Sequence, residues 1–203
     1  MPSITFWYDF ASTYSYPAAF RVDAAAAAAG LTVNWRPFLL GPIFAALGWP
    51  TSPFNLQPAK GRYMWRDLGR TCARLGLPFR RPELFPQNSV LAARVAYALP
   101  DDGARARFSR AVYRAEFGTE SGPGVNIGET GVMADILAGA GFAADATLAR
   151  AAAPEIRQAL RQATEAAQAL GLFGAPMLTT DDDELFWGND RLDEAVAWAS
   201  AVR

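Results

Sequence analysis

The 203-residue chain contains no histidine and only one cysteine, Cys72. The missing histidine excludes Ser-His-Asp and Cys-His catalysis, a histidine general base and histidine-based zinc sites. A single cysteine cannot form a disulfide within the chain. Any chemistry must therefore use hydroxyls, carboxylates, lysine, tyrosine, backbone amides or a bound cofactor.

The chain also lacks an excess of charge and a long apolar run. A net charge of −1 gives no general reason to expect nucleic-acid binding. No apolar run approaches the roughly 20 residues of a membrane span, and the start shows no signal-peptide core. Because 51% of the residues are hydrophobic, a sizeable core can form. We expect a cytoplasmic protein with neither a nucleic-acid nor a membrane partner.

The first part of the chain predicts a βαβ unit. Residues 3–10 are rich in aromatic and β-branched residues and predict a strand. Tyr16 to Gly30 predicts an Ala-rich helix that ends at the glycine, and Thr32 to Phe38 predicts a second strand. Two strands joined by one helix favour a parallel pair with a right-handed crossover.

Helical patterns dominate the middle of the chain, and the tail changes character. Leu40 to Ala59 is rich in Pro and Gly and predicts a loop. Helices are then expected at residues 61–76, 89–99, 101–117, 128–140, 144–152 and 154–170. In the tail, strands are expected at Met177–Thr180 and Glu184–Trp187, followed by a helix at Leu192–Val202. The predicted order is βαβ, many helices, then ββα.

Ser12 stands where the first strand meets the first helix. Thioredoxin-type enzymes hold Cys-x-x-Cys at this junction, because a helix N-terminus stabilises a thiolate. Here the sequence is Ser12-Thr13-Tyr14-Ser15, so a thiolate would have to come from outside, and glutathione is the obvious supplier. From the local sequence alone, a helix N-cap is the ordinary role of a serine at this position.

Four segments, in order along the whole chain, resemble 2-hydroxychromene-2-carboxylate isomerases and kappa-class glutathione transferases. They are Asp9-Phe10-Ala11-Ser12-Thr13-Tyr14-Ser15-Tyr16, Pro58-Ala59-Lys60-Gly61-Arg62-Tyr63-Met64, Gly174-Ala175-Pro176 and Phe186-Trp187-Gly188-Asn189-Asp190-Arg191-Leu192. The resemblance implies an α/β thioredoxin fold of the DsbA type, formed by residues 1–38 and 172–203, with an all-helical insertion at residues 39–171. Thr13 departs from the family's usual proline, and Thr51 from a frequent asparagine.

The same resemblance implies a glutathione site in which Ser12 is catalytic. Its hydroxyl would donate to the glutathione sulfur and favour the thiolate, by roughly 1.5–3 kcal/mol for a charge-assisted bond. Pro176 would be cis and expose the backbone of Ala175, whereas an ordinary turn proline would be trans. The other implied glutathione contacts are Trp187, Gly188, Asn189 and Asp190, of which the last two would receive the amino and carboxylate groups. Asp190 can also cap the final helix together with Asp193.

Three further residues are candidates for substrate binding. Lys60 would attract an anionic group on glutathione or on a carboxylate-bearing substrate, although a solvated surface charge is the ordinary role of a lysine. Asn55 is expected either to stabilise its loop or to contact substrate, and Asn88 either to start a helix or to line the pocket. Cys72 lies on the apolar face of its predicted helix, so we expect a buried and inert thiol.

These residues predict a glutathione-dependent isomerase that acts on an aromatic α-keto acid by reversible thiolate addition. A kappa-like glutathione transferase would use the same site, but its product would keep the thioether. A DsbA-like oxidoreductase is disfavoured, because neither Ser12 nor Ser15 can form a disulfide. A non-catalytic glutathione-binding protein is a further alternative. A homodimer is expected from the resemblance alone, and no metal is expected.

Overall fold

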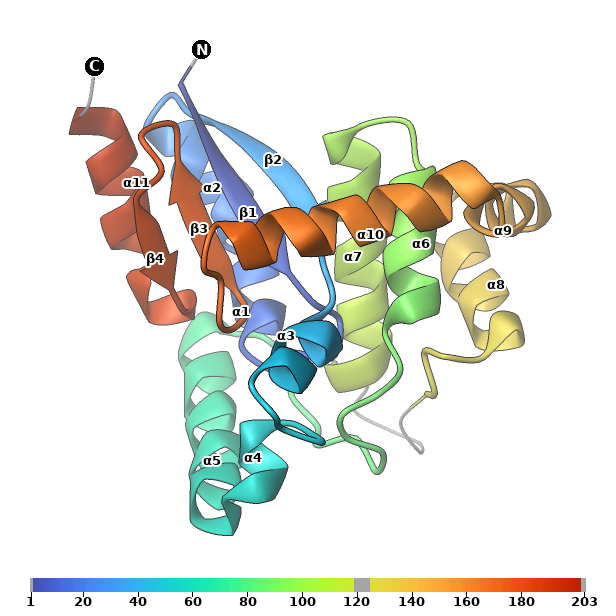
Figure 1. Ribbon diagram of the computed structural model, residues 1–203, viewed down its shortest axis with the longest axis horizontal. Helices are drawn as coiled ribbons and strands as arrows, with labels where there is room; N and C mark the ends of the chain where they lie inside the picture. Colours follow the sequence, from blue (N-terminus) through green and yellow to red (C-terminus); the bar gives the residue numbers. More distant parts are fainter. Residues whose placement is uncertain (1, 119–124, 202–203) are drawn as a thin grey trace.

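The computed structural model of the protein describes residues 2–118 and 125–201. Four strands form one mixed sheet in the order β2-β1-β3-β4 (Figure 1). Strand β1 (Ser3–Tyr8) pairs in parallel with β2 (Thr32–Pro37) and antiparallel with β3 (Met177–Thr180). Strand β4 (Leu185–Trp187) pairs antiparallel with β3. The sheet confirms both predicted halves, the parallel βαβ unit and the terminal hairpin.

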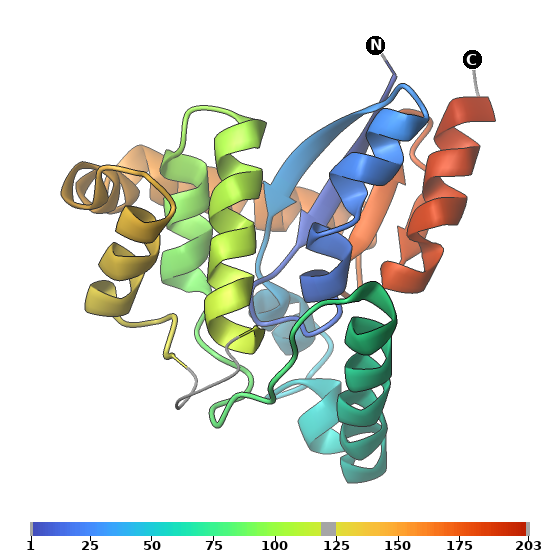
Figure 2. The same ribbon diagram turned by 180° about the vertical axis from the view of Figure 1, so that it is seen from behind.

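Helices cover both faces of this sheet (Figures 1 and 2). One face carries α2 (Val22–Ala28) and α11 (Leu192–Ala201), and the other is crossed by α10 (Pro154–Ala169). A helical insertion lies beside β2 and consists of α6 (Val90–Ala98), α7 (Asp102–Phe117), α8 (Thr130–Gly139), α9 (Ala144–Ala151) and α10. The predicted α/β thioredoxin fold with a helical insertion is therefore confirmed.

Strand β1 is buried on both faces, because its alternating side chains enter two clusters. Phe6 and Tyr8 point to one face and stack at 5.2 Å, with the ring of Trp35 against both. Trp7 points to the other face and packs edge-on against Phe38. Packing on both sides fixes the strand, and with it the loop that starts at its carboxyl end.

Two sequence predictions about helices were wrong. The helix predicted from Tyr16 to Gly30 is divided into α1 (Ser15–Ala19) and α2. At the junction, the N–H groups of Phe20 and Arg21 donate three residues back, to Pro17 and Ala18, so the chain tightens into a 3₁₀-like turn.

The predicted loop at Leu40–Ala59 contains two short helices, α3 (Leu40–Ala46) and α4 (Pro53–Leu56), and α5 starts at Pro58 and ends at Leu75. Ser52 caps α4, since its Oγ accepts from the Phe54 N–H at 3.3 Å. A proline follows this cap at the first helical position, where its missing N–H costs nothing.

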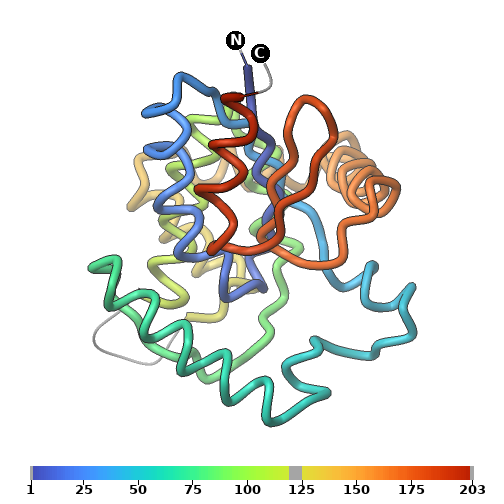
Figure 3. Tube along the Cα trace, turned by 90° about the vertical axis from the view of Figure 1, so that its left-hand side faces the viewer, coloured from blue at the N-terminus to red at the C-terminus, as the bar shows by residue number. Residues whose placement is uncertain are grey.

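The remaining predicted elements agree with the structure to within two residues at each end, as far as the chain is described; Val202 lies outside the described residues. Figure 3 shows that α4 and α5 extend beyond the end of the sheet at which β1 ends. In the described part of the chain, no helix combines the length and the apolar character that crossing a membrane requires.

Candidate functional site

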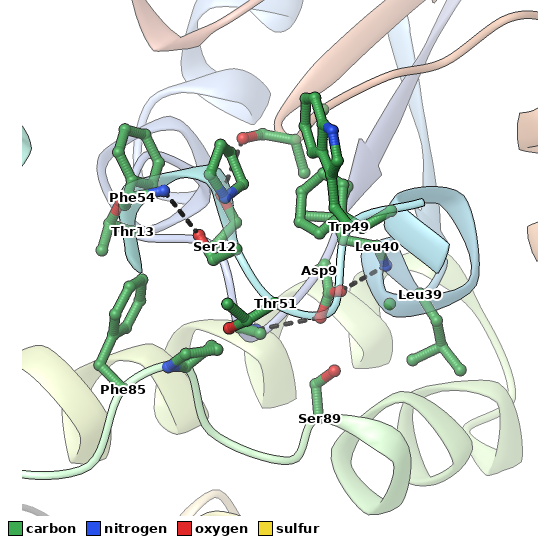
Figure 4. Close-up of a pocket in the computed structure, with 18 of the residues that line it drawn as sticks. Asp9, Ser12, Thr13, Leu39, Leu40, Trp49, Thr51, Phe54, Phe85 and Ser89 are labelled. Carbon is green, nitrogen blue, oxygen red and sulfur yellow. Dashed lines mark hydrogen bonds between the residues drawn. The ribbon is translucent and has the colours of Figure 1, made fainter. Parts of the chain in front are cut away.

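A cleft of about 510 Å³ opens at the carboxyl end of β1. One side is the β1–α1 loop together with residues 173–175, and the other is formed by residues 39–60 and 85–90. Figure 4 shows Trp49, Phe54 and Phe85 arranged around the loop that carries Asp9 and Ser12. The cleft thus joins segments from the start, the middle and the end of the chain.

Ser12 lies on the floor of this cleft and is only 7% exposed. Its Oγ donates a 2.7 Å hydrogen bond to the carbonyl of Ala175, a residue 163 positions further along the chain. The N-cap of α1 is Tyr14, and Ser12 receives only a long 3.4 Å contact from the Ser15 N–H. The hydroxyl is therefore held mainly by the distant loop rather than by its own helix.

The Ala175–Pro176 peptide bond is cis, as the resemblance implies. Ala175 lines the cleft, and its N–H donates to no group in the described part of the chain. Its carbonyl already accepts from Ser12, whereas the Pro176 carbonyl accepts from the Gly188 N–H at 2.9 Å. The loop thus offers the Ala175 N–H to a ligand as a free backbone donor, while the Ala175 carbonyl is occupied by the Ser12 hydroxyl.

The turn that follows β4 packs onto this loop. Trp187 is 51% exposed and lines the cleft, with its indole so close to Gly174 that an added Cβ there would lie 2.5 Å from Nε1. Gly188 has φ +110°, which favours glycine. A side chain at Gly174 would therefore displace Trp187 from the wall of the cleft, and one at Gly188 would displace the Asp190 carboxylate.

Asn189 and Asp190 lie beyond the wall of the cleft. Asn189 is buried, and its backbone carbonyl and Oδ1 both accept from Arg21, at 2.7 and 2.9 Å. Arg21 also pairs with both oxygens of Asp193, which leaves no capping pair between Asp190 and Asp193 among the described residues. The exposed Asp190 carboxylate contributes to raising the pKa of the cleft residue Tyr14, behind burial and Asp67. The Asp190 carboxylate therefore lies near enough to the cleft to interact electrostatically with Tyr14 on its wall.

Arg21 is a residue that sequence reasoning missed. It lies in the junction between α1 and α2, and its side chain is 22% exposed. Its only sequence signal is that it is the one arginine of an Ala-rich segment whose other charged residue is Asp23. The guanidinium fork holds the turn at residues 189–193 against the start of the fold.

The three candidate substrate residues have different positions. Lys60 and Asn88 are exposed and line the cleft. Asn88 also starts α6, because its Oδ1 accepts from the Val90 N–H at 3.1 Å. Asn55 is not part of the wall of the cleft, and its Nδ2 donates to Thr51, which is.

Two buried acids were also missed: Asp9 on the wall of the cleft and Glu116 on α7. The Asp9 carboxylate accepts from the N–H groups of Ala11 and Leu40, at 3.0 and 2.7 Å. Burial raises the pKa of Asp9, and these hydrogen bonds oppose the rise. Glu116 on α7 is 1% exposed, and its carboxyl oxygens have no hydrogen-bond partner in the described chain. Burial, and secondarily the charge of Asp9, raise the pKa of Glu116 well above its ordinary value.

The single thiol is buried, as predicted. Cys72 is fully buried on α5 and outside the wall of the cleft. Burial raises the pKa of the Cys72 thiol to about 11, so it stays protonated and unreactive at neutral pH. The thiol therefore takes no part in the chemistry of the cleft.

Comparisons with known proteins agree with this geometry. The model of the DSBA-like thioredoxin domain matches residues 3–197. A 2-hydroxychromene-2-carboxylate isomerase from Sphingobium xenophagum is 32% identical over 192 residues, which cover 94% of each chain.

Two solved structures show the same fold. A structure of 2-hydroxychromene-2-carboxylate isomerase superposes with a TM-score of 0.86 at 24% identity, covering 98% of this chain and 95% of the other. The cytosolic disulfide reductase DsbM from Pseudomonas aeruginosa, solved with GSH, gives a TM-score of 0.64 at 19% identity, covering 98% and 96%. By sequence and by fold, the chain belongs to the family of DSBA-like thioredoxin domains and is similar within it to 2-hydroxychromene-2-carboxylate isomerase.

Proposed function

We propose that the protein is a glutathione-dependent isomerase of the 2-hydroxychromene-2-carboxylate type. The observation that carries the proposal is the buried Ser12 hydroxyl on the floor of the cleft, bonded to the cis-Pro loop where related oxidoreductases use a thiol. Similarity over 94% of the chain to an isomerase of that name supports the same assignment. A dithiol mechanism is excluded, since Cys72 is the only cysteine and lies outside the cleft.

The residues present fit glutathione. The unpartnered Ala175 N–H suits strand-like pairing with the cysteinyl unit, which would lay the sulfur beside Ser12. Asp190 carries an exposed carboxylate with no hydrogen bond in the described chain, and it suits the free ammonium group. When bound, glutathione supplies a thiolate nucleophile that the chain itself does not have.

The chain's own groups would then do three things. Ser12 would turn its single O–H from the Ala175 carbonyl to the sulfur, and the hydrogen bond it then donates would favour the thiolate. Lys60, the only cation that the described residues place on the wall of the cleft, would attract the carboxylate of the substrate. Trp49, Phe54 and Phe85 supply an apolar wall for a flat aromatic body.

The test follows the interconversion of 2-hydroxychromene-2-carboxylate and its open-chain α-keto acid by absorbance, with and without glutathione. We expect turnover only with glutathione, which is recovered unchanged. A product that carries glutathione would instead identify a kappa-like transferase. No glutathione binding by calorimetry at millimolar concentration would overturn the proposal. Light scattering on the same sample tests the homodimer, which stays a prediction.

A further inference from the structure

A second cavity, of about 590 Å³, is lined by three arginines from two helices of the insertion. Arg94 comes from α6, whereas Arg157 and Arg161 come from α10, which packs against α6 (Figure 1). The last two are four residues apart and therefore on the same face of their helix. We call this cavity the arginine pocket.

The arginine pocket adjoins the cleft. Leu39, Pro42 and Val90 belong to the walls of both cavities, so this thin apolar partition separates them. Leu160 adds a further apolar side chain to the pocket. The wall of the pocket thus combines apolar side chains with three positive charges.

These charges have no partner within the described part of the chain. Among the described residues, none of the three guanidinium groups donates a hydrogen bond, forms an ion pair or lies over an aromatic ring. Arg94 Nε is buried without any acceptor. Of the described residues on the wall, Glu165 is the only acid; it forms an ion pair with none of the arginines, and the described wall carries an excess of two positive charges.

A solvated helix face would explain Arg157 and Arg161, which are both exposed. It does not explain Arg94, because its half-buried side chain comes from the opposing helix and its Nε is shielded from water. A buried donor without an acceptor is rare in folded proteins and indicates a missing partner. The planar guanidinium fork matches carboxylate and phosphate oxygens.

We propose that the arginine pocket binds a small organic anion, with a carboxylate or phosphate head at the three guanidinium groups and a short apolar body against Leu39, Pro42 and Val90. This site is separate from the proposed glutathione site, and it does not depend on the function proposed above. Because the two cavities share a wall, the anion would lie directly behind the cleft.

The experiment is thermal unfolding of the full chain without glutathione, in the presence of benzoate, phenyl phosphate, inorganic phosphate or the neutral benzamide. At about 100 times its Kd, an anion that binds only the folded state should raise the Tm by about 5 °C or more. We expect phenyl phosphate and benzoate to raise the Tm and benzamide to leave it unchanged. Equal effects of phenyl phosphate and inorganic phosphate would overturn the role of the apolar body.

Variants locate the site. Arg161→Gln and the double variant Arg157→Gln/Arg161→Gln should remove most of the anion effect, and both residues are exposed, so the fold should tolerate the changes. Arg66→Gln is the matched control, since Arg66 is exposed on α5 and lines neither cavity. Loss of the effect in Lys60→Gln, with the arginine variants unaffected, would place the anion in the cleft and overturn the proposal. A change of oligomeric state in the arginine variants, with unchanged anion affinity, would also overturn it.

Discussion

The floor and the roof of the cleft are built in opposite ways. The floor, comprising Asp9, Ser12 and Ala175, is buried and cross-linked by hydrogen bonds between segments far apart in the sequence. The roof, comprising Trp49 and Phe54 in the segment of short helices, is apolar and partly exposed. Hydrogen bonds therefore fix the positions of the groups on the floor, whereas Trp49 and Phe54 contribute shape and apolar area.

Removing the hydroxyl on the floor should have the largest effect. Ser12→Ala should lower kcat by about 100-fold, the usual loss when one donor to a developing anion is removed. The affinity for glutathione, measured by calorimetry, should change far less. Ser15→Ala is the control, because Ser15 does not line the cleft. Equal losses of stability and kcat in Ser12→Ala would assign a structural role to the hydroxyl.

The acid beneath the floor should affect stability rather than turnover. Burial raises the pKa of Glu116 above its ordinary value of 4.5, so the folded protein holds a proton that the unfolded chain releases. The free energy of unfolding therefore falls as the pH rises from 4.5 towards the raised pKa of the folded state, and the contribution of Glu116 to stability is greatest below pH 4.5. Glu116→Gln should flatten this fall and stabilise the protein at pH 8 by roughly 1 kcal/mol or more, because the neutral amide needs no proton to be buried uncharged.

Urea unfolding of this variant at pH 5 and pH 8 checks the prediction, with the exposed Glu155→Gln as control. A gain of equal size at both pH values would show that ionisation of Glu116 is not the cause. Unchanged turnover would keep this carboxyl out of the chemistry of the floor.

Weakening the turn beside the floor should have a smaller effect. Arg21→Gln removes the fork that holds Asn189 and Asp193. The proposed ammonium receptor at Asp190 lies in the same turn, so KM for glutathione should rise by about tenfold with kcat nearly unchanged, equivalent to about 1.4 kcal/mol. Arg191→Gln, which removes an exposed ion pair, is the control. A loss confined to kcat would contradict the assignment of Arg21 to positioning.

Changes on the roof should have the smallest effect. Trp49 is 39% exposed, and Trp49→Ala should raise KM for the aromatic substrate by about threefold, because one partly exposed wall residue contributes about 1 kcal/mol or less. Affinity for glutathione should be unaffected. A large loss of kcat in this variant would contradict the distinction between floor and roof, since it would show that the roof also positions the reacting groups.

The fold was predictable because its periodic patterns are long and its end signals are clear. Gly76, at φ +65°, ends α5 where the sequence predicted a stop. Short elements were missed, since α3 and α4 have seven and four residues and show no sustained period. The cap at Ser52 followed by Pro53 was the available signal for α4.

Two signals identified Ser12 as a candidate site residue: its position at a strand-to-helix junction and the family resemblance. Its bond to Ala175 depends on a meeting of residues 163 positions apart, which no local pattern encodes. Arg21 and Glu116 were missed for the same reason, because their significance depends on what packs around them. Asn189 shows the converse, since a residue expected to face a ligand turns inward to Arg21.

Because Cys72 is the only sulfhydryl and is buried on the inner face of α5, the polypeptide has no redox-active thiol pair of its own. Mild oxidants should leave its covalent structure untouched. Under the proposed chemistry, the rate of the reaction in an oxidatively stressed cell would follow the cellular ratio of reduced to oxidised glutathione. It would recover fully when that ratio is restored.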